Sequence, residues 1–208
     1  MKMMSAVAVL TVAASCLSTA VTAQTLTPEE ILRMVDERVD ELGPYEALLN
    51  DPDPERSLAA LQIMMGSGDA TLRRLALEFG IQASDTTVRH AALSAFFATG
   101  PVLTVEFDGT AVTDSDYLST IRSRLDATLG PDGVAYRPRK VGAFDEEQSC
   151  FIYHGSSNCY ISVSNSGIAL SSTNYSAFGQ LELDGVVRGV ASLDRVSDPV
   201  PFSIRIIE

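Results

Sequence analysis

A threefold repeat of 16 residues is the feature that most limits what this chain can fold into. Aspartate recurs at Asp53, Asp69 and Asp85, and each unit ends in a small residue. Alanine and leucine recur at the same spacing, at Ala60, Ala76, Ala92, Leu61, Leu77 and Leu93. Because aspartate is favoured at a helix start, each unit predicts one helix of about 11 residues. One such helix cannot bury its apolar face alone, so the three must stack.

The third unit carries a family resemblance. The segment from Asp85 to Leu93, DTTVRHAAL, resembles the start of the second helix of a HEAT-type repeat. The resemblance extends over residues 53–100 and departs from the family in its period, since 16 residues is near half of a HEAT repeat. It implies a scaffold for protein contacts. The three aspartates, with Arg73 and Arg89 one turn into their helices, are then candidates for interaction or capping. A small irregular bundle explains the same pattern.

Another helix is predicted before the repeat. The sequence Thr27-Pro28-Glu29-Glu30 is a strong helix start, in which Thr27 caps the backbone and Glu30 completes a capping box. Apolar residues follow at helical spacing, and Gly43-Pro44 is expected to end the helix.

After Pro101 the apolar period changes from helical to alternating, which predicts strands. We expect them at residues 102–107, 134–136, 150–153, 159–163, 168–172, 179–183, 186–193 and 202–207, with one helix at 114–129. Short strands with close-set turns indicate an antiparallel meander, either a small barrel or a sandwich. The predicted class is α+β, with stacked short helices (HEAT-like or a small bundle) followed by this meander.

The N-terminus has the pattern of a secretory signal. Lys2 precedes an apolar run, and Val21-Thr22-Ala23 predicts cleavage after Ala23. A lipoprotein site at Cys16 ranks second, because Ala13 stands where a larger aliphatic residue is usual. We therefore predict a signal peptide at 1–23, a helical repeat domain at 24–100 and a β-domain at 101–208. The protein is expected to be periplasmic or secreted, without a transmembrane segment in the mature chain.

Two cysteines remain after the predicted cleavage. Cys150 and Cys159 are expected to form a disulfide, because export exposes them to an oxidising compartment. If residues 151–153 and 156–158 pair through a His154-Gly155 turn, the two cysteines lie directly opposite each other. A metal site on Cys150, His154 and Cys159 is the rival, but it lacks a fourth ligand. We predict no metal site.

The chain is acidic, with a formal net charge of −12. Such a charge repels nucleic acid and anionic membranes and attracts basic partners, without naming one. The basic cluster Arg137-Pro138-Arg139-Lys140 stands out against it. Pro138 favours an exposed, extended stretch or an edge strand. Arg137, Arg139 and Lys140, together with His154, are candidate contacts for an anion or another ligand.

Catalytic signatures are missing from the sequence. No nucleophile elbow surrounds His154, and there is no phosphate loop, dinucleotide fingerprint or zinc-protease helix. We predict no catalytic residue and no cofactor, and leave open whether the chain is an enzyme. An exported, non-enzymatic interaction protein is the first hypothesis. The alternatives are an acidic β-domain that binds a ligand or inhibits a basic enzyme, and a hydrolase. An exposed apolar patch favours the first, a concave pocket the second, and converging groups with shifted pKa the third.

Overall fold

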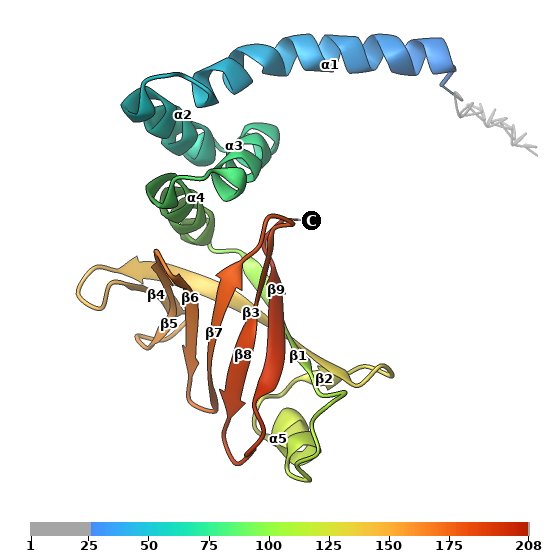
Figure 1. Ribbon diagram of the computed structural model, residues 1–208, viewed down its shortest axis with the longest axis vertical. Helices are drawn as coiled ribbons and strands as arrows, with labels where there is room; N and C mark the ends of the chain where they lie inside the picture. Colours follow the sequence, from blue (N-terminus) through green and yellow to red (C-terminus); the bar gives the residue numbers. More distant parts are fainter. Residues whose placement is uncertain (1–25, 208) are drawn as a thin grey trace, which may run out of the picture. The chain divides into compact units, whose positions relative to one another are not determined.

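The computed structural model describes residues 26–207, and this part of the chain divides into two compact units between Glu41 and Leu42. Within it, four helices precede the first strand, and a fifth helix precedes the second strand (Figure 1). The predicted α+β class is confirmed. The predicted signal peptide, its cleavage after Ala23 and Cys16 lie outside the described residues. No helix among the described residues has the length and apolar character needed to cross a membrane.

Helix α1 spans Pro28–Leu49 and begins with the predicted capping box. The Thr27 N–H donates to Glu30 Oε2 at 2.9 Å, and the Glu30 N–H donates to Thr27 Oγ1 at 3.2 Å. The predicted end at Gly43-Pro44 is wrong, because the helix continues through Pro44. A proline ring normally clashes with the Cβ of the residue before it. Gly43 has no Cβ, so it tolerates the helical conformation there.

The three repeat units form the predicted helices, of 13 residues each: α2 (Pro54–Gly66), α3 (Ala70–Gln82) and α4 (Thr86–Ala98). Each begins after its aspartate, which accepts a hydrogen bond from the backbone N–H two residues on, as Asp69 Oδ1 does from Thr71 at 2.7 Å. The recurring leucines are buried, and the three helices contact one another. Capping and burial of the repeated positions therefore set these helices.

The strands form one antiparallel sheet that closes on itself. They are β1 (Val102–Asp108), β2 (Thr128–Leu129), β3 (Val134–Asp145), β4 (Cys150–Tyr153), β5 (Cys159–Ser164), β6 (Gly167–Ser172), β7 (Tyr175–Leu181), β8 (Val186–Leu193) and β9 (Val200–Arg205). Strands β3 to β9 pair in chain order. Strand β1 lies between β9 and β3 and closes an eight-strand barrel, with β2 added beside β3. The predicted meander is confirmed, and it is a barrel.

The helix expected at 114–129 is shorter than predicted, since α5 covers only Tyr117–Ser123. Thr128 and Leu129 instead pair with β3, so ladder hydrogen bonds replace helical ones. Tyr117 and Ile121 of α5 are buried, whereas Leu118 is exposed.

The barrel has two ends that differ in what lies there. The turns after β3, β5 and β7 are at one end, where α4 contacts β3 and β5 and the Phe97 and Phe151 ring centroids lie 5.6 Å apart. The turns after β4, β6 and β8 are at the other end, with α5 (Figure 1). We call this second end the α5 end.

Candidate anion-binding site

Arg137 is buried in β3, whereas Pro138 next to it is exposed in extended backbone, as predicted. Arg137 pairs with Val105 of β1, while on the other side of β3 the pairing with β2 ends at Tyr136 and the pairing with β4 begins at Val141. Arg137 is 5% exposed. Side chains alternate along a strand, so Arg139 shares its face, and Pro138 and Lys140 are exposed on the opposite face. Long-range pairing, which local sequence does not reveal, decided this outcome.

The two arginines converge on one neutral acceptor. Arg137 Nε donates to the Leu125 carbonyl at 2.7 Å, and Arg139 NH2 donates to the same oxygen at 3.2 Å. Arg137 NH1 and Arg139 Nε are buried without a hydrogen-bond partner among the described residues. No described carboxylate forms an ion pair with either arginine. Two buried or half-buried cations therefore share one carbonyl and have no counter-ion within the described protein.

The Leu125 carbonyl is available because α5 ends just before it. Leu125 follows the C-cap residue Arg124, so its carbonyl has no helical partner and can accept from other groups. The segment is held in place by the turns at this end: Asn174 Nδ2 donates to the Arg124 carbonyl at 2.7 Å, and Arg124 pairs with Asp194. The acceptor of the two guanidiniums is thus fixed by the barrel itself.

A second set of hydrogen bonds holds the loop before α5 in place. Asp198 Oδ2 accepts from the N–H and hydroxyl of Thr113 and from the Asp114 N–H, and Asp114 accepts from the Ser197 N–H at 2.7 Å. These hydrogen bonds hold the pKa of Asp198 and Asp114 below the usual range. Asp116, at the start of α5, makes no side-chain capping bond.

Tyrosines surround the Arg137 side chain. The Arg137 Cζ lies 5.2 Å from the centroid of the Tyr175 ring, and the Tyr175 hydroxyl donates to the Tyr160 hydroxyl at 3.3 Å. Burial raises the pKa of both phenols, and the charge of Arg137 only partly offsets it. Both hydroxyls are therefore neutral at pH 7 and provide no negative charge for Arg137.

A cavity of about 400 Å³ opens beside Arg137. It lies at the α5 end, because its walls come from the β4–β5 and β6–β7 connections. Arg137 is the one charged residue of its lining, which otherwise consists of Tyr153, Ser156, Asn158, Cys159, Ser171, Ser172, Thr173 and Asn174. Hydroxyls and amides of this kind hydrogen-bond to the oxygens of a ligand, and the volume suits a small molecule.

The predicted disulfide is confirmed and borders this cavity. Cys150 and Cys159 are bonded, with their Cα atoms 5.8 Å apart. The two-residue turn is wrong: Cys159 pairs with Ile152, after a register shift, and residues 154–158 form the connection. This longer turn brings Ser156 and Asn158 to the cavity. Since both sulfurs are in the disulfide, the rival metal site with His154 is not formed.

The other predicted site residues are dispersed. His154 is exposed in the same turn but does not line the cavity. Arg73 and Arg89 are half-buried on α3 and α4, and the aspartates serve as helix caps. The sequence reasoning missed the polar residues at 156, 158 and 171–174. The unbroken polar run Ser171-Ser172-Thr173-Asn174, placed between two apolar strands, is the signal that points to them.

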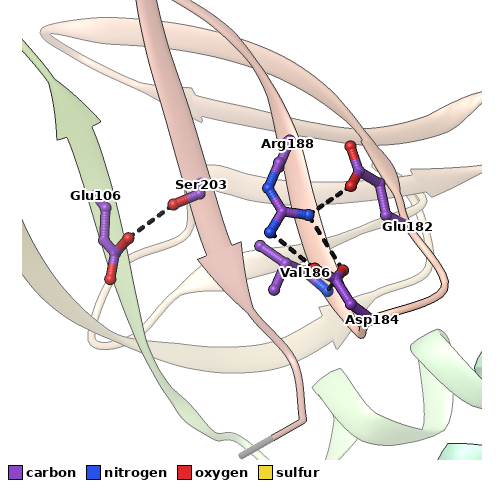
Figure 2. Close-up of polar contacts among 6 residues, drawn as sticks. All are labelled: Glu106, Glu182, Asp184, Val186, Arg188 and Ser203. Carbon is purple, nitrogen blue, oxygen red and sulfur yellow. Dashed lines mark hydrogen bonds and ion pairs between the residues drawn. The ribbon is translucent and has the colours of Figure 1, made fainter.

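A separate polar cluster lies on the outer face of the barrel, as Figure 2 shows. Arg188 pairs with Glu182 and with Asp184, which lie before and in the β7–β8 turn. Across β9 and β1, Ser203 donates to Glu106 Oε2 at 2.8 Å. The hydrogen bond from Arg188 lowers the pKa of Asp184, and the same bond raises the pKa of Arg188. These contacts favour the charged forms of Arg188 and Asp184. They therefore suit ion pairs that hold the β7–β8 turn in place, and they do not suit a group that transfers protons.

Among residues 26–207, no group of three or more His, Cys, Asp or Glu is placed to hold a metal ion. Comparison with known protein families, with curated proteins and with solved structures finds no match for this chain.

Proposed function

We propose that this chain is an exported binding protein that holds a small anionic ligand at the α5 end of its barrel. The main observation behind this proposal is that Arg137 is 5% exposed and has no counter-ion among the described residues. Burying an uncompensated charge is costly, so buried charges are normally paired. The absence of a pair is notable in a chain with a net charge of −12, where acidic residues are plentiful.

The form of the cavity supports this proposal. A concave, polar site in the β-domain is what the ligand-binding alternative requires, and barrel mouths are common places for such sites. Export is supported by the disulfide, which persists in oxidising compartments, and by the N-terminal signal pattern.

Thermal unfolding of the purified, oxidised protein tests the proposal. A ligand that binds only the folded state stabilises it by RT ln(1 + [L]/Kd), so Tm rises with ligand concentration. We expect phosphate or acetate to raise Tm above that in chloride at equal ionic strength, and Arg137→Met to abolish the rise. Arg122→Met, which removes an exposed arginine on α5, is the matched control and should keep it. Identical melting in all three salts would refute the proposal.

Protein contact is a second candidate, favoured by the apolar stripe of α1. Ile31, Met34, Val35 and Val39 follow at helical spacing and are 48%, 49%, 50% and 63% exposed. On α2–α4, by contrast, Ile63 is the one large apolar side chain exposed. Helix α1 also carries seven acidic and two basic residues, which suits a partner with a basic rim. The HEAT-like pattern at 53–100 supports the same role.

Affinity capture from the envelope or medium tests this second candidate. We expect partners retained by the wild-type protein to be lost with Val35→Asp, because a charge on the stripe opposes apolar docking. Asp36→Asn, on the polar face, should retain them. Equal retention by both variants would exclude the stripe as the contact surface.

A further inference from the structure

The cation beside the cavity is one of two. Arg137 and Arg139 stand two residues apart on one face of β3, and both donate to the Leu125 carbonyl, at 2.7 and 3.2 Å. We infer that the ligand at the α5 end carries two negative charges, as a phosphate monoester or a dicarboxylate does. This inference rests on the proposed function.

Among the described residues no carboxylate pairs with either arginine, and the only further acceptor is the Pro138 carbonyl, to which Arg139 NH1 donates at 2.9 Å. The phenols of Tyr160 and Tyr175 are neutral, Asp194 is paired with Arg124, and Asp198 accepts from backbone and hydroxyl donors of the α5 loop. The Leu125 carbonyl is neutral, so its oxygen provides only a partial negative charge. Two like charges that share one acceptor also repel each other, more strongly inside the protein than in water. A monoanion would leave one of them uncompensated, whereas a dianion compensates both.

The cavity supplies the further donors that a dianion needs. Ser172, Thr173 and Asn158 place hydroxyl and amide groups around Arg137. Phosphate and carboxylate oxygens accept several hydrogen bonds at once, and charge-assisted bonds to arginine are the stronger ones. The volume of about 400 Å³ leaves room for the organic part of a small ester or diacid.

Ligand pairs that differ in charge and little in size test the inference by isothermal titration calorimetry at pH 8 and fixed ionic strength. The probes are methyl phosphate against dimethyl phosphate, and succinate against monomethyl succinate. We expect the dianion of at least one pair to bind about tenfold more tightly than its monoanion, or better. If methyl phosphate is the dianion that binds more tightly, the ligand is a phosphate monoester. If succinate binds more tightly, the ligand is a dicarboxylate.

Variants assign the second charge to Arg139. Arg139→Gln should bring the affinity ratio of the favoured pair towards one and change the monoanion affinity little, whereas Arg137→Gln should weaken both ligands. Arg122→Gln is the control and should change neither. The wild-type protein gives an independent readout. If methyl phosphate is the favoured dianion, its affinity should fall as pH drops through its second pKa, near 6, while dimethyl phosphate binding stays constant.

The outcomes separate the two proposals. Equal affinity for dianion and monoanion in both pairs would overturn the double charge and leave anion binding at Arg137 standing. No binding of any of the four probes would overturn both.

Discussion

At the scale of single residues, glycine sets how closely two repeat helices approach. Gly80 on α3 is buried, and a Cβ built there would overlap the Cβ of Ala92 on α4. Gly66, at the end of α2, has nothing within 4 Å of the same position. Both are helical glycines, and only Gly80 packs against a neighbouring helix.

Replacing Gly80 with alanine should destabilise the protein by about 1–3 kcal/mol, because the added methyl overpacks the α3–α4 contact. Gly66→Ala should be neutral or stabilise by about 0.5–1 kcal/mol, since alanine favours the helix and meets no neighbour. Urea denaturation of both variants measures the difference. Equal effects would show that helix propensity, not packing, governs Gly80.

Asp198 gives a pH-dependent test at the same scale. Its pKa is lowered from 3.8 by hydrogen bonds from Thr113 and Asp114. Because the pKa is lower in the folded state than in the unfolded state, the ionised carboxylate stabilises the protein at pH values above the unfolded-state pKa. This contribution is lost as the pH falls through the folded-state pKa. Asp198→Asn should therefore lower Tm at pH 7, and the difference from wild type should shrink below pH 3.8.

Thermal melts between pH 2.5 and 7, taken in buffers of about 0.1 M ionic strength, measure this dependence. Asp116→Asn is the control, since the Asp116 carboxylate makes no capping bond. A Tm difference for Asp198→Asn that stays constant across the range would contradict the proposed role.

At the scale of elements, local signals predicted what local forces decide. The capping aspartates mark the starts of α2, α3 and α4, and the alternating residues 186–193 coincide with β8. The misplaced features depend on distant partners. Strand β3 was expected at only three residues, and its pairing with β1 up to Lys140 and with β4 from Val141 extends it to Asp145. The cavity residues from two separate turns could not be grouped without the strand order.

The β4–β5 hairpin offers a prediction at this scale. Removing the disulfide with Cys150→Ser and Cys159→Ser together should lower the free energy of unfolding by about 2–3 kcal/mol, since the closed loop is short. Urea denaturation measures it. Wild type with reductant should match the double variant, and reductant should leave the double variant unchanged. If reductant also lowered the free energy of unfolding of the double variant, its effect on wild type would not come from loss of this disulfide.

At the scale of the whole molecule, the question is whether helices α2–α4 and the barrel unfold together. Both belong to the compact unit that begins at Leu42, and Phe97 on α4 is fully buried with its ring against Phe151 of β4. The predicted division at residue 100 stays a prediction until unfolding is measured.

Phe97→Ala should cost about 3–5 kcal/mol, because it removes a large buried ring. Helix unfolding is followed by circular dichroism at 222 nm, and barrel unfolding by the near-ultraviolet signal of its tyrosines. We expect both midpoints to fall together. Leu183→Ala, at a side chain 74% exposed, should shift neither. A fall in the helical midpoint alone would mean that the helices and the barrel are separate folding units.

The position of β1 has a consequence for the order of synthesis. This strand is the first of the sheet to be made, and one of its two neighbours, β9, is the last. Until Val200–Arg205 has emerged, the facing edges of β1 and β8 expose unpaired backbone groups, the kind of surface on which chains aggregate. A nascent chain must therefore be shielded from the synthesis of β1 until β9 is complete, and a stop codon just before Val200 should be as damaging as one in the middle of the barrel.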